Sequence, residues 1–153
     1  MKAFNLKTAL LIFLGFGLTT ISCSEDDIPS INQTQNQIED VAQSGDWKIT
    51  FFEDSGKDET NHFTGYNFVF NSNGVLNASN GTNNYDGTWS ITDSNSNDDS
   101  QDDLDFNIYF DLTNDFEELN GDWDFISNSL TKIELIDVSG GNGGTDYLTF
   151  EKN

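Results

Sequence analysis

Side chains that could perform catalysis or bind a metal are scarce in this sequence of 153 residues. It contains one cysteine, Cys23, and one histidine, His62. A single cysteine excludes an internal disulfide, and a single histidine argues against a histidine-centred metal or acid–base site. We therefore expect a non-enzymatic protein with no catalytic residues, no cofactor and no bound metal. His62 is interpreted as a surface residue.

Acidic side chains are abundant instead. There are 27 Asp and Glu residues against 6 Lys and no Arg, which gives a formal charge of −21. Nucleic acid is therefore a poor partner, because its phosphates would be repelled. Residues 93–103 begin like a calcium loop, but Asp98 stands where glycine is needed and Leu104 where the bidentate acid belongs. A solvated loop is favoured, and weak Ca²⁺ binding by Asp98, Asp99, Asp102 and Asp103 is the alternative.

The N-terminus has the features of an export signal. Lys2 and Lys7 precede an apolar run at residues 9–18, which is too short to span a bilayer as a mature helix. Small or apolar residues stand directly before Cys23, and this arrangement resembles the lipobox cut by the bacterial lipoprotein signal peptidase. Thr20 occupies the position where leucine is usual. The resemblance implies that Cys23 becomes the acylated first residue of the mature chain.

An acidic tetrapeptide, Ser24-Glu25-Asp26-Asp27, follows this cysteine. It resembles the export signal of surface lipoproteins of Bacteroidota. We therefore expect a signal peptide at residues 1–22, an acylated, flexible tether at 23–37 and a folded domain at 38–153. The expected location is the outer membrane, with a lipid anchor and display at the cell surface; an anchor facing the periplasm is the alternative. Removing residues 1–22 removes two lysines and no acids, so the mature charge is −23.

The domain has the pattern of short strands separated by Gly, Asn and Asp clusters. A helical turn is expected at residues 38–43. Strands are expected at 47–52, 62–70, 75–79, 85–92, 104–112, 123–127, 130–138 and 147–152. Apolar side chains alternate with polar ones in several of these segments, which indicates antiparallel strands with one buried face.

The connections support neighbouring pairing along the chain. Asn80-Gly81 and Ser55-Gly56 supply the positive φ that tight hairpins require. Asn114 and Glu117 resemble a capping box ahead of a single helical turn. The sequence therefore predicts an all-β fold, an up-and-down antiparallel β-barrel of about eight strands. A β-sandwich is the alternative.

Gly45-Asp46-Trp47 lies at the entry of the first strand and there resembles the G-x-W signature of lipocalins. The resemblance covers residues 38–153 and implies a lipocalin-like barrel that Trp47 helps to close. Lipocalins commonly place an arginine over this tryptophan, and Lys152 is the candidate substitute in a chain without arginine. Two further Gly-x-Trp triplets, ending at Trp89 and Trp123, are interpreted as strand entries that place a large aromatic in the core.

The lipocalin resemblance implies a small hydrophobic ligand inside the barrel. An eight-stranded barrel has room for side chains or for one small ligand, and 13 Phe residues could fill it. The alternative is therefore an interaction or structural module with a filled barrel or sandwich, which contacts a protein or glycan.

Overall fold

The computed structural model describes residues 35–93, 103–138 and 144–153. The expected signal peptide, Cys23, the tetrapeptide at 24–27 and the central part of the acidic loop lie outside these residues. The described elements are α1 (Gln35–Gln43), β1 (Asp46–Asp54), β2 (Lys57–Asp58), η1 (Thr60–Phe63), β3 (Asn67–Phe70), β4 (Val75–Ser79), β5 (Asn84–Asp93), β6 (Leu104–Tyr109), η3 (Asp115–Leu119), β7 (Gly121–Asn128), β8 (Lys132–Asp137) and β9 (Asp146–Lys152).

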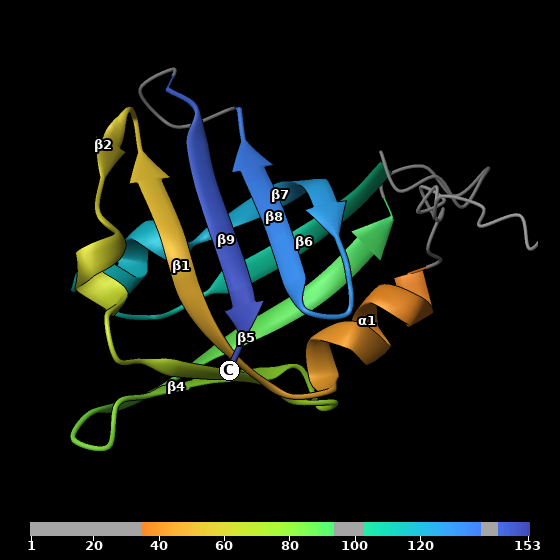
Figure 1. The fold of residues 1–153 in the computed structure, drawn as a ribbon, viewed down its shortest axis with the longest axis horizontal. Helices are drawn as coiled ribbons and strands as arrows, with labels where there is room; N and C mark the ends of the chain where they lie inside the picture. Colours follow the sequence, from red (N-terminus) through yellow and green to blue (C-terminus); the bar gives the residue numbers. More distant parts are fainter. Residues whose placement is uncertain (1–34, 94–102, 139–143) are drawn as a thin grey trace, which may run out of the picture. The chain divides into compact units, whose positions relative to one another are not determined.

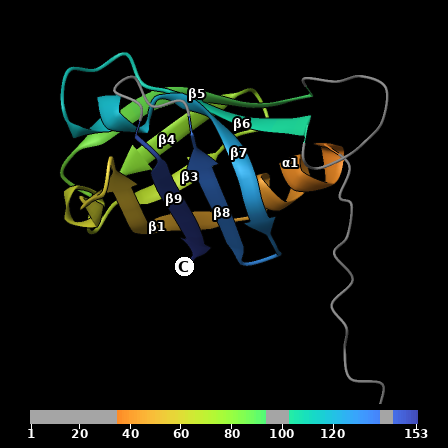
Figure 2. The ribbon, with the colours of Figure 1, turned by 90° about the horizontal axis from the view of Figure 1, so that it is seen from above.

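The strands form a closed antiparallel β-barrel (Figures 1 and 2). β3 to β9 pair in sequence order, β1 pairs with β3, and the ring closes where β1 pairs with β9. The barrel therefore has the eight strands β1 and β3 to β9, and the two-residue strand β2 extends the sheet beside β1. The up-and-down barrel prediction is confirmed, and the open edges of a sandwich are excluded by the β1–β9 pairing.

The turns use the positive-φ residues that the sequence offers. Ser55 has φ 51° and Gly56 φ 83° between β1 and β2, while Gly74 has φ 80° before β4 and Gly81 φ 82° before β5. Asn114 caps η3 because its side-chain oxygen accepts a hydrogen bond of 3.1 Å from the Phe116 backbone N–H. These local signals explain why consecutive strands are also neighbours in the sheet.

The strand expected at residues 62–70 is wrong over its first half. Residues 60–63 form the 3₁₀ helix η1, and Gly65 has φ 84°, so β3 begins only at Asn67. The Asp58 side chain accepts a hydrogen bond of 3.0 Å from the Thr60 backbone N–H, which starts the turn. Phe63 is nevertheless buried, because the turn directs its ring into the core. The helix expected at 38–43 begins three residues earlier, at Gln35.

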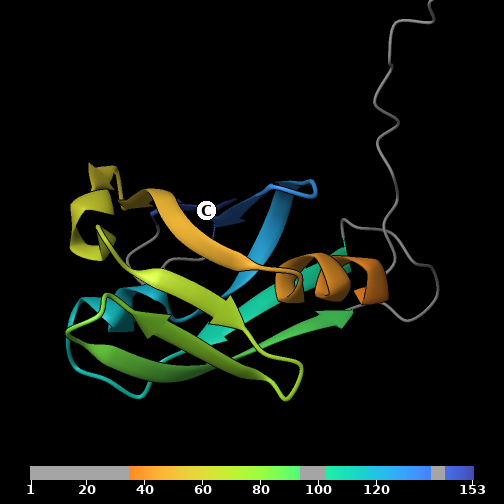
Figure 3. The ribbon, with the colours of Figure 1, turned by 60° about the horizontal axis from the view of Figure 1, so that its bottom comes forward.

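Helical segments lie at opposite ends of the barrel (Figures 1 and 3). At one end α1 packs near β3 and β5 and buries Ile38, Val41 and Ala42. At the other end η1 buries Phe63, and η3 buries Phe116 and Leu119. Apolar side chains therefore cover both ends of the interior. Within the described ranges, none of the helices is long and apolar enough for a membrane crossing.

Candidate functional site

The residues expected to close the barrel lie together where α1 meets β1 and β9. Trp47 is fully buried, and its indole N–H donates a hydrogen bond of 2.8 Å to the Ala42 carbonyl at the end of α1. The Lys152 ammonium lies 5.0 Å from the centre of the Trp47 ring and donates to Ser44 Oγ at 2.6 Å. A Cβ on Gly45 would lie 3.5 Å from Lys152 Cε, which is an ordinary contact. The structure therefore brings Gly45, Trp47 and Lys152 together, with the lysine in cation–π range.

The two other Gly-x-Trp triplets have structural roles of their own. The Trp123 indole donates at 3.1 Å to the Leu119 carbonyl of η3, just as Trp47 does to α1, so each ties a strand entry to the helix before it. Gly87 lies inside β5 and is required by space: a Cβ there would lie 2.6 Å from the Tyr109 carbonyl oxygen. Because Gly87 has no side chain, the end of β6 and the Phe110 ring can lie directly against β5.

Aromatic rings from several strands contact one another inside the barrel. The Phe70 ring centre lies 5.2 Å from that of Trp89, 5.3 Å from Phe106 and 5.4 Å from Phe150. Phe68 lies 5.5 Å from Phe150. β3 is separated from β6 by β4 and β5, and from β9 by β1, so these contacts cross the interior. These buried rings therefore pack against one another inside the barrel.

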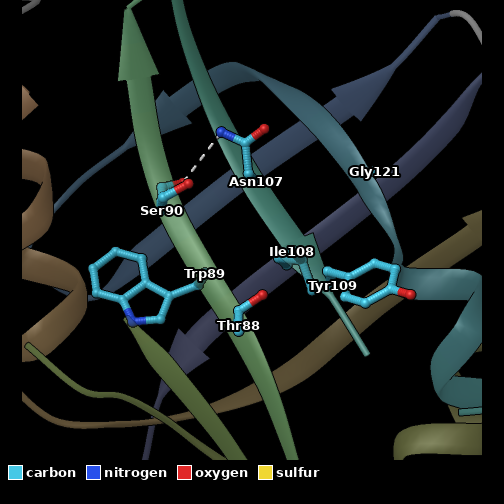
Figure 4. Close-up of a pocket in the computed structure, with 7 residues that line it drawn as sticks. All are labelled: Thr88, Trp89, Ser90, Asn107, Ile108, Tyr109 and Gly121. Carbon is cyan, nitrogen blue, oxygen red and sulfur yellow. Dashed lines mark hydrogen bonds between the residues drawn. The ribbon is translucent and has the colours of Figure 1, made fainter. Parts of the chain in front are cut away.

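A groove lies on the outer surface of β5 and β6 and opens to solvent (Figure 4). Its volume is about 420 Å³, and it is lined by Thr88, Trp89, Ser90, Asn107, Ile108, Tyr109 and Gly121. Thr88 lies opposite Tyr109 and Ser90 opposite Asn107 in the strand register. The Trp89 indole points away from the groove, whereas the Tyr109 ring lies on the outer side and is 55% exposed.

The groove presents neutral polar groups around one aromatic ring. Asn107 Nδ2 donates to Thr92 Oγ1 at 2.9 Å and to the Ser90 carbonyl at 3.4 Å, so the amide is held against the sheet. Thr88 and Ser90 add hydroxyl groups that both donate and accept. Such a surface can form hydrogen bonds to a polar ligand while the Tyr109 ring contacts its apolar face.

Acidic residues gather on the outer surface beside this groove. Asp105 of β6 lies directly opposite Asp124 of β7 in the strand register. Partial burial raises the pKa of the Asp105 carboxyl, and the charges of Asp124, Asp122 and Asp93 raise it further. Like charges opposite each other in a sheet are destabilising, so this cluster weakens the folded state at neutral pH.

Replacing Asp105 with Asn is expected to raise the free energy of unfolding at neutral pH by about 0.2–1 kcal/mol. The raised pKa means that the folded state holds the proton more tightly than the unfolded chain does. The penalty is therefore fully present above the folded pKa, it is lost as the pH falls from the folded pKa towards the unfolded value of about 3.9, and it is absent below that value. Urea unfolding at several pH values measures this. Asp111→Asn removes a charge outside the strand pair and should change little; a gain at Asp105 that is equal at all pH values would contradict the explanation.

A second cluster lies at the end closed by η1 and η3. Glu59, His62 and Glu118 each offer a ligand atom, and these atoms all lie within 4.8 Å of one another. His62 Nδ1 lies 3.4 Å from Glu118 Oε2. The hydrogen bond from Lys57 lowers the pKa of the Glu59 carboxyl, whereas burial and the charge of Glu59 raise the pKa of Glu118.

Sequence reasoning missed this cluster. His62 was expected at the surface, and its side chain is 27% exposed; its place beside Glu118 was not expected. The spacing of Glu59 and His62 gave no signal, because a strand was expected from residue 62 and the 3₁₀ helix η1 that follows Glu59 was not foreseen. Glu118, 56 positions beyond His62, could not be assigned from spacing. The expected calcium ligands Asp98, Asp99 and Asp102 lie outside the described residues.

The fold is that of a closed, eight-stranded antiparallel barrel with one added strand. Comparison with solved structures finds a DUF4847 family protein from Bacteroides vulgatus, with 16% sequence identity and a TM-score of 0.49. The match covers 76% of this chain and 97% of that one. No protein-family model matches the chain, and no curated protein matches it.

Proposed function

We propose that this protein is a non-enzymatic binding module with a filled barrel, which meets its partner on the outer surface. The observation that carries this proposal is the ring packing of Phe70 with Phe106 and Phe150 across the interior. Together with the apolar side chains at both ends, it favours the filled barrel over the carrier of a small hydrophobic ligand. A carrier would need to displace rings that already contact one another, and each well-packed aromatic contributes several kcal/mol to stability, about 3–5 by truncation.

The proposal places this module at the outer membrane, anchored by lipid on Cys23 and displayed at the cell surface. Its support is the sequence alone: the apolar leader, the cysteine and the acidic tetrapeptide at 24–27. The proposal includes a lipocalin-like architecture for the barrel. It is supported by the strand order and by the contact between Trp47 and Lys152.

The groove on β5 and β6 is the binding surface that we propose, and its chemistry suits a neutral glycan. Sugar hydroxyls can pair with Thr88, Ser90 and Asn107, while the apolar face of a sugar ring can lie on Tyr109. The surrounding acids, including Asp105 and Asp122, would repel an anionic ligand. A protein partner on the same groove is the competing outcome of the experiment.

Affinity electrophoresis through gels that contain neutral polysaccharides tests this proposal. The chain is expected to be retarded by at least one polysaccharide, and Tyr109→Ala should weaken that binding about tenfold or more, because a central exposed aromatic is the usual energetic anchor. Phe51→Ala is the matched control, since Phe51 is an exposed aromatic on β1, away from the groove. Retardation that is equal in the two variants would contradict the proposed site, and a protein captured through Tyr109 without any glycan binding would favour the competing partner.

Native mass spectrometry tests the filled interior separately. Apart from the acyl chains proposed on Cys23, the chain purified from cells should carry no apolar molecule, and a non-covalently retained lipid or other apolar compound in the intact barrel would reverse the choice between the two functions.

A further inference from the structure

The cluster formed by Glu59, His62 and Glu118 joins two short helices that are distant in the sequence. Glu59 lies directly before η1, His62 lies within it, and Glu118 belongs to η3. All three ligand atoms lie within 4.8 Å of one another. The geometry therefore brings one imidazole nitrogen and two carboxylates to a single point at the closed end of the barrel.

Glu59 supplies an independent sign that a partner is missing from this point. The residue is only 5% exposed. One of its carboxylate oxygens, Oε1, contacts the Lys57 ammonium. The other, Oε2, is inaccessible to solvent and has no hydrogen-bond partner. Buried carboxylate oxygens are normally paired, because leaving one unpaired costs about 1–3 kcal/mol or more.

We propose that Glu59, His62 and Glu118 bind one divalent cation of the zinc class. Zn²⁺ accepts imidazole nitrogen and carboxylate oxygen at about 2.0–2.2 Å in tetrahedral geometry, so neighbouring ligand atoms lie roughly 3.4 Å apart. His62 Nδ1 and Glu118 Oε2 already have this separation, at 3.4 Å. Glu59 Oε2 can turn to the same ion while Oε1 keeps Lys57, and water completes the fourth position.

The ligand types select among cations. Mg²⁺ and Ca²⁺ prefer oxygen ligands alone, whereas imidazole favours Zn²⁺ and neighbouring transition ions. The charges around Lys57 are acidic, since those of Glu59, Glu118 and Asp54 all raise the pKa of its ammonium, and an acidic surrounding attracts cations. The Lys57 side chain is 75% exposed, so its ammonium can stay on Glu59 Oε1 at the solvent side while Oε2 turns to the ion.

The bound ion would hold η1 against η3. These helices already meet through Phe63 and Phe116, whose ring centres lie 5.4 Å apart. The cation would add a polar link on the outer side of this apolar contact and would keep the end of the barrel closed. Its role in this proposal is structural.

Isothermal titration of the full chain with ZnCl₂, in mild detergent at fixed pH, tests the site. One saturable ion per chain is expected, and Mg²⁺ at the same concentration should not displace it. His62→Gln and Glu118→Gln should each weaken Zn²⁺ binding about tenfold or more. Even the loss of a residue that only hydrogen-bonds to a metal ligand lowers metal affinity by roughly 10–100-fold. Glu117→Gln, which removes the adjacent acid of η3, should bind as the native chain does.

The single histidine of the chain gives a second measurement that does not require a variant. In nuclear magnetic resonance spectra its one set of imidazole signals should shift when one equivalent of Zn²⁺ is added. An imidazole signal that stays unchanged through saturation would overturn the proposal. The same holds if His62→Gln and Glu118→Gln, once shown to be folded by circular dichroism, bind Zn²⁺ with native affinity, because the acids of the surface would then account for the binding.

Discussion

Replacing Phe70 with Ala is expected to lower the free energy of unfolding by about 3–5 kcal/mol. The residue is 1% exposed, and its ring contacts Trp89, Phe106 and Phe150. Truncation therefore removes buried apolar surface and leaves a cavity at the centre of the barrel. Urea unfolding followed by tryptophan fluorescence measures the change. Phe51→Ala, which truncates an outward-facing ring that is 37% exposed, should cost much less.

The same variant distinguishes a filled barrel from a hollow one. A dry apolar cavity that is left by a large-to-small substitution can bind a benzene-sized molecule. Phe70→Ala should therefore be stabilised by benzene, whereas the native chain should not respond. If benzene stabilises both chains equally, the native interior contains free space and the filled-barrel interpretation fails.

Replacing Cys23 with Ala is expected to move the protein completely from the membrane fraction to the soluble fraction. Each buried CH₂ of an acyl chain contributes about 0.8 kcal/mol to anchoring, and stable attachment needs more than one chain. No other anchor is proposed for the mature protein, so the loss should be all or none. Fractionation and immunoblotting of cells measure the effect, and circular dichroism should show an unchanged barrel.

Ser22→Ala is the matched control for Cys23→Ala. It changes the residue beside the proposed cleavage site but keeps a small side chain there, so attachment to membranes should persist. A Cys23→Ala protein that still sediments with washed membranes would contradict lipid anchoring and would require another membrane contact.

The strand pattern could be predicted because the strands have one solvent-exposed face and one buried face. The alternation in β6, where Leu104, Phe106 and Ile108 are buried, is visible in the sequence. The turn residues before β4 and β5 are local signals as well. The 3₁₀ helix at residues 60–63 could not be predicted in the same way, because Phe63 continues the aromatic pattern of the following strand and only the Asp58 hydrogen bond starts the turn.

The candidate sites were harder to predict because they depend on distant contacts. Trp47 and Lys152 were found through a family resemblance, and β1 and β9 bring them together. The Glu59, His62 and Glu118 cluster depends on how η1 packs against η3, which no local pattern encodes. The ring contacts inside the barrel could not be predicted either, since the number of Phe residues does not say which rings meet.

The pairing of β1 with β9 has a consequence for how the chain is made. One of the two barrel neighbours of β1 is β3, which lies about twenty residues further along the chain. The other is β9, which is synthesised roughly a hundred residues after β1. Such long-range pairing slows folding, because the intervening loop must be closed before the contact forms. The ring of strands therefore cannot be completed while the ribosome is still translating the segment before β9. A nascent chain that stays open until then would remain suited to being threaded through a translocation channel.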